Sequence, residues 1–129
     1  MTQRVLTLQP EDRVLDHLNI FKDNNIKHVP VLSKDKQVVG MVSEKDFENY
    51  VNIVKILQSR EDPVLVRDVM TTPAFTLSDK IEIQDVAQAM IDNSIHAMVI
   101  TDENGHLLGI VTSTDLLKHL ANRDRYDRF

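Results

Sequence analysis

Hydrophobic residues in the first half of the chain follow a fixed order of patterns. The order begins with an extended stretch at 5–8 and continues with apolar residues at helical spacing at 14–21. Two short apolar runs follow, at 28–32 and 37–42. Apolar residues three and four positions apart share one face of a helix, whereas short apolar runs bounded by turn residues are typical of strands. With a further helix expected after Ser43, this half predicts a β-α-β-β-α unit.

The second half repeats this order. The corresponding segments lie at 74–77, 83–90, 97–101 and 106–111. A closing helix is expected after Thr112. Polar residues separate the two central strands in each half, at 33–36 and 102–105, and such residues between two strands predict a hairpin. The hydrophobic pattern therefore predicts the same unit twice.

Residue identities indicate that the two halves are copies. A shift of 69 positions, the distance from Gly40 to Gly109, aligns the halves without a gap. The shift also pairs identical Asp, Asn and Val residues, among them Asp16/Asp85, Asn24/Asn93, Val42/Val111 and Asp46/Asp115. Two amphipathic patterns that match by chance would not bring such residues together, so we interpret the chain as an internal duplication.

The duplication divides the chain into a first repeat at 1–60 and a second at 61–129, with a polar, Pro-containing linker at 59–63. The second repeat is introduced by the segment 66–71, of which the first repeat has only Met1-Thr2. We therefore expect the chain to be a fragment whose first repeat lacks its lead-in.

Composition excludes several function classes. The hydrophobic share of 42% and charged share of 27% are those of a globular protein, and the net charge of −5 argues against non-specific binding to nucleic acid. Without cysteine the chain has no disulfide, thiol nucleophile or Cys-rich zinc site, which fits a reducing cytoplasm. Apolar runs such as 97–100 are far below the roughly 20 residues that span a bilayer. No signal peptide is recognisable.

The strongest local motif lies where the last strand of each repeat meets its helix. A hydroxyl residue is followed three positions later by a carboxylate, Ser43 with Asp46 and Thr112 with Asp115. This spacing is typical of a capping box, which stabilises a helix start. The same helix start also suits a phosphate or sugar oxygen, and a carboxylate beside it suits ribose hydroxyls. Both interpretations use the same residues.

Three motifs together resemble a tandem pair of CBS domains, the units named after cystathionine β-synthase. They are Gly-x-Val-Ser/Thr-x-x-Asp in both repeats, the strand at 27–31 and the Val-x-Asp-Val-Met-Thr opening at 66–71, and the resemblance extends from Met1 to about Leu120. It implies an α/β (α+β) fold of two units related by a pseudo-two-fold axis, with strands that form clefts. It also implies regulatory binding of AMP, ADP, ATP or S-adenosylmethionine, no catalytic cofactor, a homodimer formed through helices, and a fused or associated effector.

The resemblance also implies site residues. Asp46 and Asp115 would hold ribose hydroxyls, and Ser43 and Thr112 would contact ribose or phosphate. The base in the second site would be flanked by Thr71, Thr72, Pro73, Ile95, His96 and Ala97. The base in the first site would be flanked by Thr2, Gln3, Arg4, Lys27, His28 and Val29.

The sequence departs from the family pattern in two places, and the second departure counts against the first site. Pro30 has Val99 as its counterpart, and the position after the hydroxyl residue, often basic in nucleotide binders, is Glu44 or Ser113. Glu44 would repel a phosphate, whereas the second site has the polar run Thr112, Ser113 and Thr114. Phosphate charge would then need His96, Lys27, His28 or a partner chain. An adenosine ligand with little negative charge is equally consistent with these residues.

Three functions remain to be compared. The duplicated hydroxyl–carboxylate motif favours a ligand-binding regulatory module. Glu44 and Val99 favour a structural dimerisation module with empty clefts. An enzyme ranks last, because the sequence offers no set of nucleophile, base and orienting group.

An apolar stripe in each closing helix suggests both core packing and a dimer face. The stripe comprises Phe47, Tyr50, Val51, Val54 and Leu57 in the first repeat, and Leu116, Leu117 and Leu120 in the second.

Overall fold

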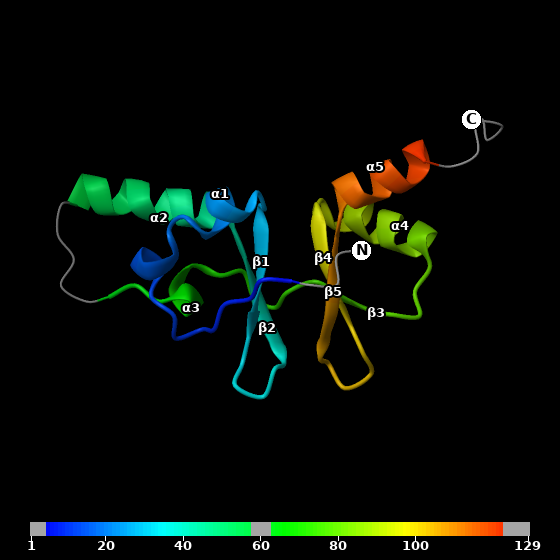
Figure 1. The fold of residues 1–129 in the computed structure, drawn as a ribbon, viewed down its shortest axis with the longest axis horizontal. Coiled ribbons are helices and arrows are strands. Elements are labelled where there is room, and N and C mark those ends of the chain that lie inside the picture. Colours follow the sequence, from blue (N-terminus) through cyan, green and yellow to red (C-terminus); the bar gives the residue numbers. More distant parts are fainter. Residues whose placement is uncertain (1–4, 58–62, 123–129) are drawn as a thin grey trace. The chain divides into compact units, whose positions relative to one another are not determined.

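The computed structural model describes residues 5–57 and 63–122, without the side chains of 54–57 (Figure 1). These residues form two compact units, Val5–Ala74 and a second unit from Phe75 onward. None of the helices in the described residues is both long and apolar enough to cross a membrane.

The first unit is built around an antiparallel hairpin. Strand β1 (His28–Leu32) pairs with β2 (Val38–Ser43), so that His28 lies opposite Ser43. The hairpin is preceded by the 3-10 helix η1 (Val14–His17) and helix α1 (Ile20–Asn24), and followed by α2 (Glu44–Leu57) and α3 (Val66–Val69). Leu8, in the predicted extended stretch, forms only an isolated parallel bridge with Val31.

The helix predicted before β1 is broken into the two short pieces η1 and α1. Its start is held by a distant part of the chain. Arg13 forms an antiparallel bridge with Leu65, and the backbone N–H of Val14 donates to the carbonyl of Val64 at 3.0 Å. Because Arg13 is extended in this bridge, helical backbone begins only at Val14. The equivalent helix of the second unit is continuous.

Residues 63–74 pack on the first unit, although the sequence repeat assigns them to the second. Val64 and Val66 are buried in the first unit's core, and Thr71 exchanges two backbone hydrogen bonds with Met41 of β2, at 2.8 and 3.1 Å. The compact units therefore divide near Ala74, whereas the repeat interpretation divides the chain at 60. The linker residues 59–62 lie outside the described residues.

The second unit contains a three-stranded sheet in the order β3-β4-β5. Strand β3 (Thr76–Ser78) is parallel to β4 (Ala97–Thr101), and β4 is antiparallel to β5 (Leu107–Thr112). Helix α4 (Ile83–Asn93) precedes β4, and α5 (Ser113–Ala121) follows β5 (Figure 1). The predicted bounds of β1 and β4 are confirmed, and β2 and β5 each lie one residue later than predicted.

Each unit has its own hydrophobic core. In the first, Phe21 of α1 and Phe47 of α2 meet edge to face, with ring centroids 5.1 Å apart, above the buried hairpin residues Val29, Val31 and Val42. In the second, Val86 and Met90 of α4 pack on the sheet residues Met98, Ile100 and Val111. Phe47 and Tyr50 of the predicted stripe are thus core residues, and the side chains of Val54 and Leu57 lie outside the described residues.

Candidate functional site

The two strand–helix junctions have the same hydrogen bonds. In the first unit, the Ser43 N–H donates to Asp46 Oδ2 at 2.8 Å, and the Asp46 N–H donates to Ser43 Oγ at 3.1 Å. In the second, the same two bonds join Thr112 and Asp115, also at 2.8 and 3.1 Å. The capping-box interpretation of the motif is therefore confirmed in both repeats.

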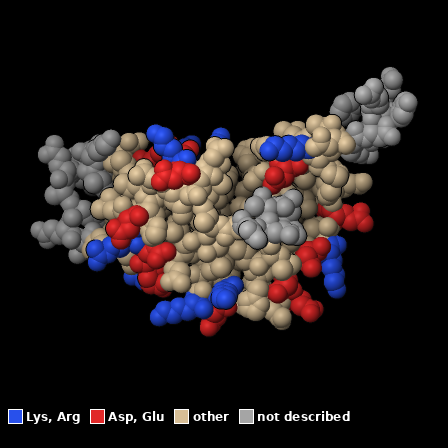
Figure 2. Space-filling view, in the orientation of Figure 1, with Lys and Arg blue, Asp and Glu red and all other residues tan. Residues whose placement is uncertain are grey.

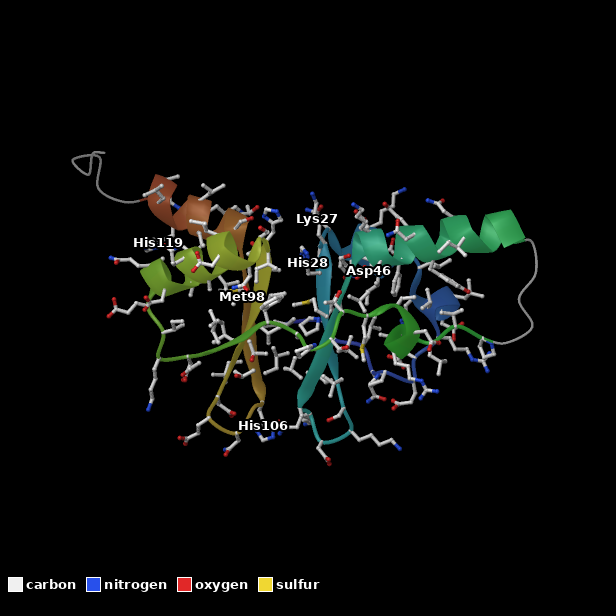
Figure 3. All side chains as sticks on the ribbon, turned by 180° about the vertical axis from the view of Figure 1, so that it is seen from behind. Lys27, His28, Asp46, Met98, His106 and His119 are labelled. Carbon is white, nitrogen blue, oxygen red and sulfur yellow. The ribbon has the colours of Figure 1, made fainter. Side chains whose placement is uncertain are left out.

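Each junction is also tied to the residue that precedes the first central strand. The backbone N–H of Glu44 donates to the Lys27 carbonyl, and that of Ser113 donates to the His96 carbonyl, both at 2.9 Å. The hairpin register further places Ala97 opposite Thr112, as it places His28 opposite Ser43. In the first unit, Lys27, His28 and Asp46 consequently lie at the same end of the hairpin (Figure 3).

This geometry limits what a junction can bind. In α5 the N–H groups of Ser113 and Asp115 already have acceptors, so the helix start has fewer donors for a phosphate than the motif alone suggested. The hydroxyl of Thr112 accepts one bond and keeps its own proton as a donor. Within the described residues, the hydrogen bonds to Asp46 and Asp115 end on Oδ2 of each carboxylate. A carboxylate can accept on both of its oxygens, so Oδ1 is the candidate acceptor for a ligand hydroxyl.

The predicted site residues fall into three groups by burial. Ser43, Asp46, Thr112 and Asp115 are half-buried, and the exposed predicted residues are Lys27, Thr71, Thr72, Pro73, His96 and Thr114. The Val29 side chain is fully buried in the first unit's core, so a ligand can reach only its backbone. Thr2, Gln3 and Arg4 lie outside the described residues.

The predicted base-flanking residues of the second site are distributed over both units. Thr71, Thr72 and Pro73 belong to the first unit, where Thr71 is bonded to Met41 of β2. Ile95, His96 and Ala97 belong to the second unit, at the start of β4.

Asp115 lines a pocket of about 230 Å³ inside the second unit. The polar residues around it are Ser78 and Asp79, at the end of β3, and His119, one turn after Asp115 on α5. His96 and Ser113 line a different hollow, between α4 and α5, so the structure does not bring every predicted second-site residue into one pocket. Sequence analysis missed Ser78, Asp79 and His119. The spacing of four between Asp115 and His119 on one helix was the available signal for His119.

Asp46 lines a pocket of about 420 Å³ in the first unit. A second carboxylate, Asp68, lines it as well, and the described residues around this pocket include no Lys, Arg or His. The pocket of Asp115 also has two carboxylates, Asp79 and Asp115, and differs in having His119, whose imidazole can donate a hydrogen bond to an anion.

Elsewhere the surface has mixed charge. On the face drawn in Figure 2, acidic and basic side chains alternate and do not gather in one patch. Among the described residues, no three His, Asp or Glu side chains lie close enough together to hold a metal ion.

Two curated relatives match most of this chain. The protein MK0525 of Methanopyrus kandleri is 27% identical over 88% of the chain, and an inosine-5'-monophosphate dehydrogenase of Methanocaldococcus jannaschii is 27% identical over 96% of it. The chain spans 57% of the first protein and 24% of the second.

Two solved structures share the fold. CBSX2 in complex with AMP superposes with a TM-score of 0.81 at 24% identity, over 94% of this chain and 92% of that one. The CBS domain pair of MJ0100, in complex with 5'-methylthioadenosine and S-adenosylmethionine, also has a TM-score of 0.81, at 18% identity, over 96% and 94%. The family model of the CBS domain matches residues 1–52 and again 66–122. The duplicated unit, its capped strand–helix junction and these matches agree, and the chain belongs to the CBS domain family.

Proposed function

We propose that this chain is a non-catalytic regulatory module that binds an adenosine-type nucleotide. The observation that carries the proposal is the duplicated junction, in which a hydroxyl and a carboxylate are held by reciprocal hydrogen bonds at the surface of each unit. Such a site is preorganised, since neither side chain has to be ordered when a ligand arrives.

The chemistry of the junction matches a ribose. Asp115 uses Oδ2 for the backbone of Thr112, and Oδ1 remains to accept hydrogen bonds from vicinal hydroxyls. The Thr112 hydroxyl, which accepts from the Asp115 N–H, has its proton to donate to a ribose or phosphate oxygen. AMP, 5'-methylthioadenosine and S-adenosylmethionine, the ligands of the two similar structures, have an adenosine in common.

We favour the second repeat as the binding repeat. Its helix begins with Ser113 where the first repeat has the acidic Glu44. Both pockets have two carboxylates, but His119 lines the pocket of Asp115, whereas the described residues around the pocket of Asp46 include no Lys, Arg or His. An anionic ligand is therefore better accommodated near Asp115. Thr71, Thr72 and Pro73, with Ile95, His96 and Ala97, remain our candidates for contact with the base.

The effector is proposed by analogy. The matched segment is 24% of the M. jannaschii dehydrogenase, so that enzyme contains a large part that this chain does not match. We propose that this chain transmits ligand binding to a fused or associated effector in the cytoplasm, by favouring one conformation of the module.

A structural dimerisation module is the second candidate. A hollow of about 640 Å³ lies between α4 and α5, and the side chains of Ile91 and Leu117 beside it are 71% and 64% exposed. Apolar side chains grouped in this way are typical of a protein interface. A homodimer formed through these helices is compatible with both functions, so only ligand binding separates them.

Calorimetric titration with AMP, ADP, ATP, S-adenosylmethionine and NADH tests the proposal. Asp115→Asn is the informative variant, because an amide oxygen can still cap Thr112 while the charge that attracts ribose hydroxyls is lost. Asp46→Asn is its matched control in the other repeat. We expect saturable binding by the wild type, a loss of at least tenfold in Asp115→Asn, and a smaller change in Asp46→Asn. A folded wild type that binds none of these compounds would favour the dimerisation module.

A further inference from the structure

The pocket of Asp46 in the first unit combines two carboxylates with apolar side chains. It lies where α2 and α3 contact each other, and its volume of about 420 Å³ is within the usual range of a small-molecule site. The residues that line it are Asp46, Asn49, Tyr50 and Ile53 of α2, with Val64, Asp68 and Val69 in and around α3. We call it the α2–α3 pocket.

The two carboxylates are held in the same way. Each belongs to the third residue of its helix, and its Oδ2 accepts the backbone N–H of the residue before that helix. Asp46 accepts from Ser43 at 2.8 Å, and Asp68 accepts from Leu65 at 2.9 Å. Within the described residues, neither Oδ1 has a hydrogen-bond partner. Two fixed negative charges, each with an unoccupied oxygen, therefore line the pocket.

The hydroxyl of Tyr50 is a third polar group without a partner. The residue is only 7% exposed and belongs to the first unit's core. Among the described residues this hydroxyl forms no hydrogen bond, yet no fully enclosed side-chain oxygen or nitrogen lacks a partner. The hydroxyl is therefore not enclosed, and because Tyr50 lines the α2–α3 pocket, it opens into that pocket. A hydroxyl in such a position calls for a water or ligand atom to bond to.

Apolar side chains form the remainder of the pocket. Val64 is buried and Val69 is half-buried, whereas Ile53 is 53% exposed. A ligand with methylene groups would cover Ile53 and remove its surface from water. A bare metal ion is less suitable, because aliphatic side chains cannot ligate it and the part of the chain that the structure describes has no three His, Asp or Glu side chains close enough to hold one.

We propose that the α2–α3 pocket binds a short aliphatic diamine in its doubly protonated form. One ammonium group donates to Oδ1 of Asp46 and the other to Oδ1 of Asp68, so two positive charges neutralise two negative ones. The Tyr50 hydroxyl accepts a further hydrogen bond from an ammonium group, and the methylene chain covers Ile53. This inference goes beyond the proposed nucleotide function. Asp46 serves a cation in the first repeat, whereas Asp115 serves the nucleotide in the second.

Calorimetric titration of the whole chain with 1,4-diaminobutane at low ionic strength tests the proposal, and we expect saturable binding by the wild type. Tyr50→Phe keeps the ring in the core and removes only the hydroxyl. It should weaken binding about tenfold, since a hydrogen bond to a charged group is lost. Asp68→Asn keeps an oxygen for the Leu65 N–H and removes the charge. It should weaken binding by only about fivefold, because Asp68 is exposed to solvent.

Asp12→Asn is the matched control for Asp68→Asn. Asp12 also accepts a backbone N–H on Oδ2, from Gln9 at 2.8 Å, but it does not line the pocket. This variant should bind the diamine as the wild type does. Butane-1,4-diol has the same carbon chain without the charges and should not bind, and 1-butylamine should bind more weakly than the diamine.

Amide NMR of the wild type gives a readout that needs no variant. The largest shifts on addition of the diamine should occur at Asn49, Tyr50 and Val69, and shifts centred elsewhere would contradict the proposal.

Four calorimetric results would overturn the inference. They are no saturable binding by the wild type, equal weakening by Asp12→Asn and Asp68→Asn, unweakened binding by a folded Tyr50→Phe, and 1-butylamine binding as tightly as the diamine. None of these results bears on the nucleotide function, which Asp115→Asn tests, since Asp115 does not line the α2–α3 pocket.

Discussion

Gly40 and Met70 lie so close together that no larger residue fits at position 40 without a shift. A Cβ atom on Gly40 would lie 2.7 Å from Met70 Sδ and 3.0 Å from the Thr71 carbonyl oxygen. This approach lets Thr71 pair with Met41 of β2, and so attaches the segment 63–74 to the first unit.

Gly40→Ala should therefore destabilise the first unit, by about 1–3 kcal/mol in the free energy of unfolding, as is usual for an overpacked site. Chemical denaturation measures the change. Met70→Ala in the same chain removes the sulfur but leaves the Thr71 carbonyl in place, so it should recover only part of the loss. Full recovery would show that the backbone contact is unimportant.

The two capping boxes should contribute to stability independently of any ligand. Thr112→Ala removes the acceptor of the Asp115 N–H and should cost about 0.5–2 kcal/mol in thermal or urea unfolding. Ser43→Ala should cost a similar amount in the first unit. Thr112→Ser keeps the hydroxyl and is the control. An unchanged stability of Thr112→Ala would mean that the bond contributes nothing in solution.

Asp102 should make stability depend on acid pH. Its Oδ1 accepts the backbone N–H groups of His106 and Asn104, each at 2.9 Å, and the bond from His106 is the main cause of a lowered Asp102 pKa. Because the folded pKa is lower than the unfolded one, the stabilisation is present above the unfolded pKa and is lost as pH falls through the folded value. Carboxyl NMR titration should give an Asp102 pKa below the usual aspartate range. The difference in stability between wild type and Asp102→Asn should shrink as pH falls, and a constant difference would contradict this account.

Leu117→Glu should weaken the proposed dimer by at least tenfold in sedimentation, because the new charge would be buried against an apolar partner surface. The side chain is 64% exposed, so the fold itself should be unaffected. Gln88→Glu puts the same charge on an exposed position of α4 outside the hollow between α4 and α5 and should leave association unchanged. Equal dissociation constants for both variants would exclude α4 and α5 from the interface.

Local patterns were sufficient for much of this fold and for the chemistry of its junctions. The bounds of β1 and β4 and both capping boxes involve residues within a few positions of one another, where hydrophobic spacing and hydrogen-bonding groups are visible in the sequence. The duplication was equally visible, because Gly, Asp and Asn occupy equivalent positions in both repeats.

Contacts between distant residues decided the remainder. The bridge between Arg13 and Leu65 holds the start of the first helical piece, and the approach of Met70 to Gly40 attaches the segment 63–74 to the first unit. Packing of α4 on α5 places His96 and Asp115 in different hollows. It also brings Ile91 of α4 and Leu117 of α5 to the same hollow. Sequence by itself determined the repeated unit and its capped helix starts, because those depend on neighbours along the chain. Only the tertiary structure decided which surfaces these residues share, because that depends on how helices and strands pack.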